Sequence, residues 1–165
     1  MNLTSNKYLN KSIIILIIFF LDRVTKMYVL NTFENIELKQ ILVNNYINIY
    51  LIWNKGIAFG LLNFSNQIIY NIITLLIVAV SLIIVVLAIR TRNLTGYFFA
   101  IIFGGALGNL YDRIKYNAVP DFIDLHIGNY HWFIFNVADI FITLGVFCLI
   151  YVEIIKKNKI NNEKI

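Results

Sequence analysis

The sequence predicts an all-α integral membrane protein with four transmembrane helices, organised as a single domain over residues 1–165. Hydrophobic residues make up 59% of the chain and charged residues only 14%, and the mean hydropathy is +0.74. The hydrophobic fraction and the mean hydropathy are higher, and the charged fraction is lower, than a soluble domain of this size has. Apolar runs recur along the whole sequence, so a removable signal peptide cannot account for them.

Four segments approach the roughly 20 apolar residues that a membrane-spanning helix needs. They are residues 12–31, 67–89, 96–113 and 134–152. The first resembles a signal sequence, but Leu21 is followed by Asp22 and Arg23 where cleavage would need small residues, so we expect an uncleaved helix. The second is the most apolar, because no charged residue occurs between Lys55 and Arg90.

Basic residues flank these spans and predict the topology. They precede the first span, fill the link between the second and third, and follow the fourth: Lys7, Lys11, Arg90, Arg92, Lys156, Lys157, Lys159 and Lys164. By the positive-inside rule, both termini and that link are cytoplasmic. The net charge of +5 is therefore explained by topology, and we expect no nucleic-acid partner.

With this topology, four separate segments bring polar residues to the outer membrane surface. In chain order these residues are Asp22, Lys26, Asn109, Asp112, Arg113, Asp121, Asp124, Asn136 and Asp139. Asn109, Asp112 and Arg113 share one helical face by their i, i+3, i+4 spacing. Asp121 and Asp124 fall in the outer loop, and Asn136 has the N-cap position of the fourth helix. The sequence therefore predicts one convergent polar site.

Charges at membrane depth cost about 2.5–3.5 kcal/mol each, so we expect them to be paired. Asp22 with Lys26, and Asp112 with Arg113, are interpreted as structural ion pairs. Asp121 and Asp139 have no obvious cation nearby in the sequence. Two carboxylates in a partly desolvated site share a proton, as in aspartic proteases, where one draws a proton from water and the other donates to the scissile carbonyl.

Other functions are less consistent with the pattern. A channel or transporter component would place polar groups at several depths, whereas the second span and the inner half of the fourth are nearly bare. A purely structural membrane protein would have no reason to keep two unpaired aspartates at one surface. A metalloprotease would need more ligands than His126 and His131, which lie five apart in a loop without a His-Glu-x-x-His pattern. We expect no metal and no cofactor.

Five motifs, in this order along the chain, carry a resemblance to a known family. They are Leu21-Asp22-Arg23-Val24-Thr25-Lys26, Trp53-Asn54-Lys55-Gly56-Ile57-Ala58-Phe59-Gly60, Gly104-Gly105-Ala106-Leu107-Gly108-Asn109-Leu110-Tyr111-Asp112-Arg113, Asp121-Phe122-Ile123-Asp124 and Phe135-Asn136-Val137-Ala138-Asp139. The chain resembles signal peptidase II, the prolipoprotein signal peptidases of bacteria, along nearly its whole length. Pro120 departs from the pattern, since the family more commonly has an aliphatic residue there.

The resemblance implies a multi-pass enzyme of the bacterial cytoplasmic (inner) membrane with its active site toward the extracytoplasmic face. It would cut a diacylglyceryl-modified prolipoprotein before the lipidated cysteine, with membrane lipid around it and no obligate protein partner. Carried over by motif, Asp121 and Asp139 are the catalytic pair, and Asp124 is not catalytic. The residues lining the site would be Asn54, Gly56, Asn109, Arg113 and Asn136, with Asp22, Lys26 and Asp112 as structural polar residues.

The resemblance also implies a small extracytoplasmic platform in the outer segment 32–66, between the first two spans. Ile47–Trp53 within it has a strand-like pattern. We therefore expect this platform to contain β structure and to help hold the substrate.

Overall fold

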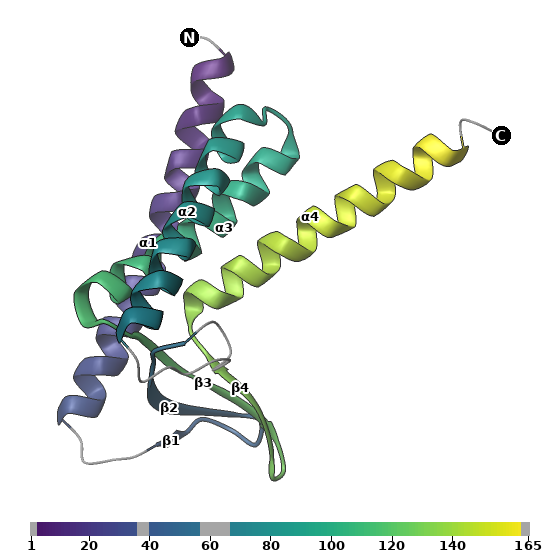
Figure 1. The fold of residues 1–165 in the computed structure, drawn as a ribbon. Helices are drawn as coiled ribbons and strands as arrows, with labels where there is room; N and C mark the ends of the chain where they lie inside the picture. The colour runs from purple at the N-terminus through teal and green to yellow at the C-terminus, as the bar shows by residue number, and fades with distance from the viewer. Residues whose placement is uncertain (1–2, 36–39, 57–66, 163–165) are drawn as a thin grey trace.

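A computed structural model describes residues 3–35, 40–56 and 67–162, and it is mostly helical with a small sheet at one end (Figure 1). In chain order the elements are α1 Leu3–Asn35, β1 Ile41–Leu42, β2 Ile47–Asn54, α2 Gln67–Arg90, α3 Leu94–Tyr116, β3 Val119–Ile127, β4 Tyr130–Phe135 and α4 Val137–Asn162. Helices α1 and α2 both pack against α3, whereas α4 starts against α3 and diverges from the other helices toward its C-terminal end. The start of α1 and the end of α4 lie away from the sheet.

Among the described residues, three helices are long and apolar enough to cross a membrane. They are Gln67–Arg90, Leu94–Tyr116 and Val137–Lys157, in agreement with the last three predicted spans. Helix α1 is 33 residues long but carries Asp22, Arg23 and Lys26 in its central turns, which lowers its apolar character. The membrane crossing by α1 stays a prediction.

The sheet is antiparallel, in the order β1-β2-β3-β4. Only β1 and β2 come from the outer segment where we expected β structure. The other two strands come from the segment between α3 and α4, so the prediction that Asp121 and Asp124 lie in a loop was wrong. Gly128, with φ 59°, lies in the tight turn that joins Ile127 to Tyr130, and such turns favour glycine.

Pro120 is fully buried in β3, opposite Trp53 of β2. In the described register β4 pairs with β3 only from Ile123 onward. Pro120 therefore lies in a part of β3 that has a single neighbouring strand, which is where a residue without an N–H group is tolerated.

Helix α3 is the centre of the helical part, because small residues let two other helices approach its backbone. A Cβ added to Gly104 would lie 3.0 Å from the Cβ of Ile18 in α1, and one added to Gly105 would lie 2.6 Å from the backbone oxygen of Ala138 in α4. Gly108 faces Asp22 of α1. The Gly104–Gly108 spacing therefore serves helix packing.

Candidate active site

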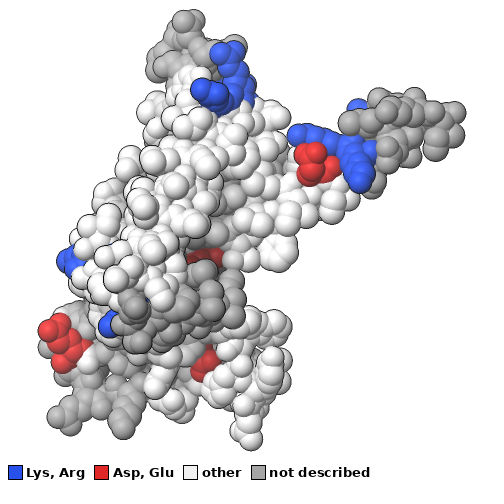
Figure 2. All heavy atoms as spheres, in the orientation of Figure 1, with Lys and Arg blue, Asp and Glu red and all other residues white. Residues whose placement is uncertain are grey.

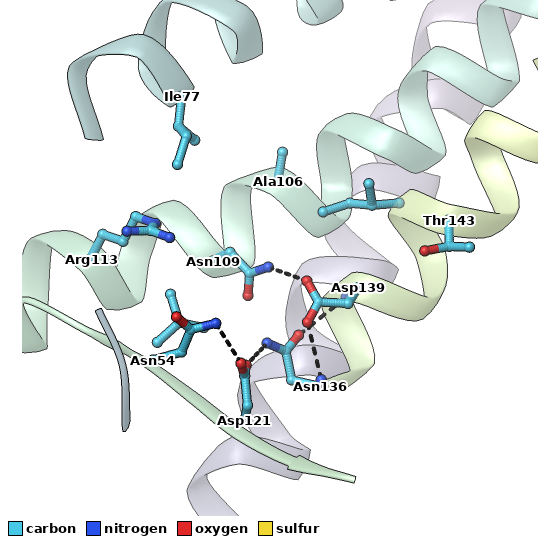
Figure 3. A pocket seen from close by; sticks show the side chains of 11 residues that line it. Asn54, Ile77, Ala106, Asn109, Arg113, Asp121, Asn136, Asp139 and Thr143 are labelled. Atoms are coloured by element: carbon cyan, nitrogen blue, oxygen red, sulfur yellow. Dashed lines mark hydrogen bonds between the residues drawn. The ribbon is translucent and has the colours of Figure 1, made fainter. Parts of the chain in front are cut away.

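A cavity of about 200 Å³ lies where α3, α4, β2 and β3 meet (Figure 3). Its polar lining consists of Asn54, Asn109, Arg113, Asp121, Asn136, Asp139 and Thr143. Apolar side chains, among them Ile77 of α2 and Ile142 of α4, complete the walls. Both aspartates predicted to act together therefore line one cavity.

Asp121 is held between two amide side chains. Its exposure is only 3%, and Asn54 Nδ2 donates a hydrogen bond to Oδ2 at 2.8 Å while Asn136 Nδ2 donates to Oδ1 at 2.6 Å. Burial, followed by repulsion from the Asp139 carboxylate, raises the pKa of Asp121 to about 6 against the stabilising effect of the two amides. This carboxyl group can therefore gain or lose a proton near neutral pH.

Asp139 lies in the first turn of α4 and forms a capping box with Asn136. The Asn136 side-chain oxygen accepts the N–H of Asp139 at 3.1 Å, and the Asp139 carboxylate accepts the N–H of Asn136 at 3.2 Å. This confirms the prediction that Asn136 is the N-cap. The other carboxylate oxygen, Oδ1, accepts a hydrogen bond from Asn109 Nδ2 at 2.8 Å.

The Asn136 amide thus joins the two aspartates. Its nitrogen binds Asp121 and its oxygen binds the backbone of Asp139, so one side chain positions both carboxyl groups (Figure 3). Asn136 is fully buried, which leaves its amide few alternative partners.

Arg113 lies on the cavity wall and donates a hydrogen bond to the backbone oxygen of Gly56. The N–H of Gly56 donates to Asn54 Oδ1 at 2.8 Å, so the backbone beyond β2 is fixed at both of its polar groups. The guanidinium also lies over the ring of Tyr70, 5.6 Å from its centroid. A second guanidinium nitrogen, Nη1, is buried and has no hydrogen-bond partner among the described residues.

A buried network of four charged residues lies between α1 and α3. Lys26 Nζ bonds Asp22 at 2.9 Å, which confirms that predicted pair, and also bonds Asp112 at 2.7 Å. Arg23 bonds Asp112 at 2.5 Å and Asp22 at 2.7 Å. The predicted Asp112–Arg113 pair was wrong, because adjacent helical residues do not face each other.

This network reaches the cavity through Asn109 and Ala138. Lys26 Nζ donates to Asn109 Oδ1 at 2.7 Å, which turns the Asn109 nitrogen toward Asp139. Asp22 Oδ1 accepts the N–H of Ala138 at 3.1 Å, at the start of α4. Asp22, Lys26 and Asp112 therefore support the site from outside it, and Arg23 is the member of the network to which sequence reasoning gave no role.

Most of the predicted site residues therefore meet. Asn54, Asn109, Arg113, Asp121, Asn136 and Asp139 line the cavity, and Gly56 contacts Arg113. Asp124 does not line it and instead contacts His131 and Asn48. The rest of the second motif, residues 57–60, lies outside the described residues.

Solved structures with the same fold are bacterial membrane enzymes. One has a TM-score of 0.72 and 30% sequence identity, and the match covers 90% of this chain and 89% of that chain. A second has a TM-score of 0.71 at 30% identity, covering 89% of this chain and 93% of the other. The fold and the cavity therefore place the protein in a class of helical membrane enzymes.

The sequence comparisons define the family. The sequence model of the signal peptidase (SPase) II family matches residues 14–155 of this chain. The lipoprotein signal peptidase of Pelagibacter ubique is 54% identical over 159 residues, which are 96% of this chain and 95% of the relative. The lipoprotein signal peptidase of Francisella tularensis subsp. novicida is 38% identical over 163 residues, 96% of this chain and 99% of the relative. The chain belongs to the signal peptidase II family.

Proposed function

We propose that this protein is a membrane-embedded aspartic endopeptidase that removes the signal peptide from diacylglyceryl-modified prolipoproteins, cutting before the lipidated cysteine. The observation that carries the proposal is the pair of buried carboxyl groups, Asp121 and Asp139, on one cavity with Asn136 between them. The substrate class follows from the relatives, which are lipoprotein signal peptidases.

In the proposed reaction, Asp139 is the ionised partner and Asp121 holds the proton. The start of a helix favours a negative charge, and Asp139 accepts the N–H of Asn136 there. Asp139 takes a proton from a water molecule, whose oxygen attacks the scissile carbonyl carbon while Asp121 donates its proton to the carbonyl oxygen. The tetrahedral intermediate then breaks its C–N bond, and the proton on Asp139 passes to the leaving amine. The collapsing hydroxyl returns its proton to Asp121.

The neighbouring residues keep these two groups aligned. Asn109 fixes the carboxylate plane of Asp139, and Asn54 together with Asn136 fixes that of Asp121. Arg113 holds the backbone at Gly56, which we propose forms part of the peptide-binding wall. Since catalytic groups must be placed to within a fraction of an ångström, these amide contacts are as important as the carboxylates they hold.

An apolar groove of about 500 Å³ adjoins the same aspartate and supports a lipid-bearing substrate. It is lined by Asp139, by Trp132 and Phe135 of β4, and by Leu144 and Phe147 of α4, among others. Its surface is almost entirely apolar, so an acyl chain there would be shielded from water beside the scissile bond. We assign the acyl chains of the substrate to this groove.

Substitution of the two aspartates tests the proposal. Asp121→Asn and Asp139→Asn should each abolish cleavage of a diacylglyceryl prolipoprotein in detergent, and the double variant should be no worse than either single one. Groups that act as one catalytic unit fail together, so removal of the second takes away little that remains. Thermal stability and binding of uncleaved substrate, measured alongside, should persist.

Asp124→Asn is the control, because Asp124 lies three residues from Asp121 on the same strand and does not line the cavity. This variant should retain substantial cleavage. If Asp124→Asn is inactive and Asp121→Asn active, the assignment of the pair is wrong. If all variants cleave normally, the protein is not an aspartic protease, and a channel or transporter role becomes the better explanation of the buried charges.

A further inference from the structure

The β3–β4 hairpin carries a second cluster of ionisable side chains, separate from the cavity. Asp124 and His126 lie two residues apart on β3, so they share a face of the sheet, and His131 lies opposite His126 on β4. Asp121, three residues before Asp124, points to the other face by the same alternation. The cluster is therefore not part of the proposed peptidase machinery.

Its donor atoms are close together. His131 Nδ1 lies 2.9 Å from one oxygen of Asp124 and 3.1 Å from the other, and His126 Nδ1 lies 3.9 Å from Oδ2. The two imidazole rings stack, with centroids 5.2 Å apart and planes at 23°. All three side chains thus present one ligand atom each within 4.8 Å of one another.

These distances fit a small divalent ion. Tetrahedral zinc binds imidazole nitrogen and carboxylate oxygen at about 2.0–2.2 Å, which puts the donor atoms roughly 3.3–3.6 Å apart. Asp124 and His131 are already slightly closer than that, at 2.9 Å, whereas His126 is 3.9 Å from Asp124 and the three donor atoms lie within 4.8 Å of one another. A side-chain rearrangement of about 1 Å would bring the three donors to tetrahedral spacing.

Two buried polar atoms at the cluster, His126 Nδ1 and Asn48 Oδ1, have no hydrogen-bond partner among the described residues. A buried polar atom without a partner costs about 1–3 kcal/mol, which bonding of His126 to a cation would offset. Asn48 Nδ2 lies 3.4 Å from Asp124 Oδ2, where it can orient the carboxylate as residues behind metal ligands do.

Access to the cluster is open. A cavity of about 580 Å³, lined by Asn48, His126, Gly128 and residues 42–46, lies beside it. His131 is on the surface, with 55% of its side chain exposed. An ion can therefore enter from solvent and keep a water molecule as its fourth ligand.

We propose that Asp124, His126 and His131 form a binding site for Zn²⁺ that clamps the β3–β4 hairpin. This departs from the expectation of no metal, but the ion takes no part in hydrolysis. It joins the two strands on the face opposite Asp121. Because a structural metal stabilises the folded state that binds it, zinc should raise the thermal stability of the protein.

The test is zinc titration of the full chain, purified in detergent with a tag that contains no histidine and stripped with chelator. Isothermal titration should give one Zn²⁺ per chain, and the melting temperature should rise with zinc. His131→Gln, an exposed position, and His126→Gln should each weaken binding by about tenfold or more. Cobalt in place of zinc should give the visible absorption of a tetrahedral N/O site in the wild type.

Two variants serve as matched controls. Asp121→Asn removes a carboxylate from the other face of the same strand and should bind zinc as the wild type does. Cys148→Ser removes the only thiol of the chain and should also bind normally. The proposal is overturned if the wild type shows no saturable binding at about 100 μM zinc, if both histidine variants bind as tightly as the wild type, or if Cys148→Ser loses the ion.

Discussion

At the scale of single residues, the proposed site depends on one amide. Asn136 donates to Asp121 and accepts from the backbone of Asp139, so the two carboxyl groups cannot be positioned independently. The environments of the two differ: Asp139 lies at the start of a helix, whereas Asp121 lies on a buried strand. Such a difference separates the roles of two identical side chains.

This difference predicts the pH dependence of cleavage. The pKa of Asp121 is raised to about 6, by burial first and by the Asp139 charge second. Since Asp121 must be protonated to donate to the carbonyl, kcat/KM should fall as pH rises through about 6. The corresponding limb of kcat should lie at higher pH, because bound substrate excludes water and raises the pKa further. If kcat/KM instead rises through this range, Asp121 must act in its ionised form, and the proton donor would then be Asp139.

Titration of Asp121 should also change the stability of the fold, which gives an independent check of the pH profile. A carboxyl group whose pKa is higher in the folded than in the unfolded chain stabilises the fold at low pH, and this contribution is lost as pH rises from about 4 to 6. The loss is on the order of 2–3 kcal/mol. In Asp121→Asn the melting temperature should decline less over this range than in the wild type. An identical decline in both would show that Asp121 titrates normally.

At the scale of elements, apolar runs were enough to locate α2, α3 and α4, because a spanning helix is specified by composition alone. The β3–β4 hairpin was missed, since its nine- and six-residue strands were read as the outer connection between two spans. That error also separated His126 from His131, which a hairpin turn brings face to face.

The candidate site was predictable to the extent that short motifs carry it. Asp121, Asn136 and Asp139 could be placed from their motifs and from the N-cap pattern. The partners of Asp112 in α1 could not, because helix geometry excludes the adjacent Arg113 but does not tell which face of α3 meets α1. That face is set by Gly104 and Gly108, whose missing side chains admit α1.

Packing of α4 against α3 predicts the effect of a single methyl group. In Gly105→Ala the new Cβ would meet the backbone oxygen of Ala138 at 2.6 Å, and backbone cannot rotate away. The first turn of α4 must then move, and Asp139 with it. We expect kcat to fall about 10²-fold, as for other displacements near 1 Å, with a smaller effect on the affinity for uncleaved substrate.

Gly145→Ala is the matched control at the same helix pair. Its Cβ, six residues beyond Asp139 along α4, would meet Ile102 Cγ1 at 2.5 Å and the backbone oxygen of Phe98 at 3.1 Å. The α3–α4 contact must give way there, so the melting temperature should drop. Because this strain lies away from the first turn of α4, kcat should stay near that of the wild type. Equal loss of kcat in both variants would mean that general disruption of the α3–α4 contact, and not displacement of Asp139, explains the first result.

At the scale of the whole molecule, charge is distributed by position along the helices. Basic side chains gather near the start of α1 and the end of α4, and the helical surface between these ends is largely uncharged on the face shown in Figure 2. Near the start of α1, Lys11 is buried and donates to the backbone oxygens of Ala88 and Thr91, at 2.7 and 2.6 Å. A lysine there satisfies carbonyls at the end of α2 and complements its dipole.

The opposite end carries the sheet and the candidate site (Figure 1). Together with the positive-inside rule, this arrangement predicts that the ends of α1 and α4 away from the sheet, and the link between α2 and α3, are cytoplasmic, with the sheet outside. The prediction requires α1 to cross the membrane despite Asp22, Arg23 and Lys26. It can do so because these charges, together with Asp112, form two positive and two negative groups that are buried against one another and not exposed to lipid.

Reporter fusions test the crossing by α1 directly. Fusions after Arg92 and after Lys159 should report cytoplasm, and a reporter inserted near Asn45, between β1 and β2, should report the outside. If α1 lay along the membrane surface, residue 45 would be on the same side as Lys7, and its reporter would read cytoplasm.

The full-length Asp112→Asn variant is the companion test. It leaves the two cations of α1, Arg23 and Lys26, with a single carboxylate, that of Asp22. Insertion of α1 should therefore weaken, and the reporter near Asn45 should give a mixed signal. A reporter near Asn45 that reads cytoplasm in the wild type would remove the proposed outer location of Asp121 and Asp139.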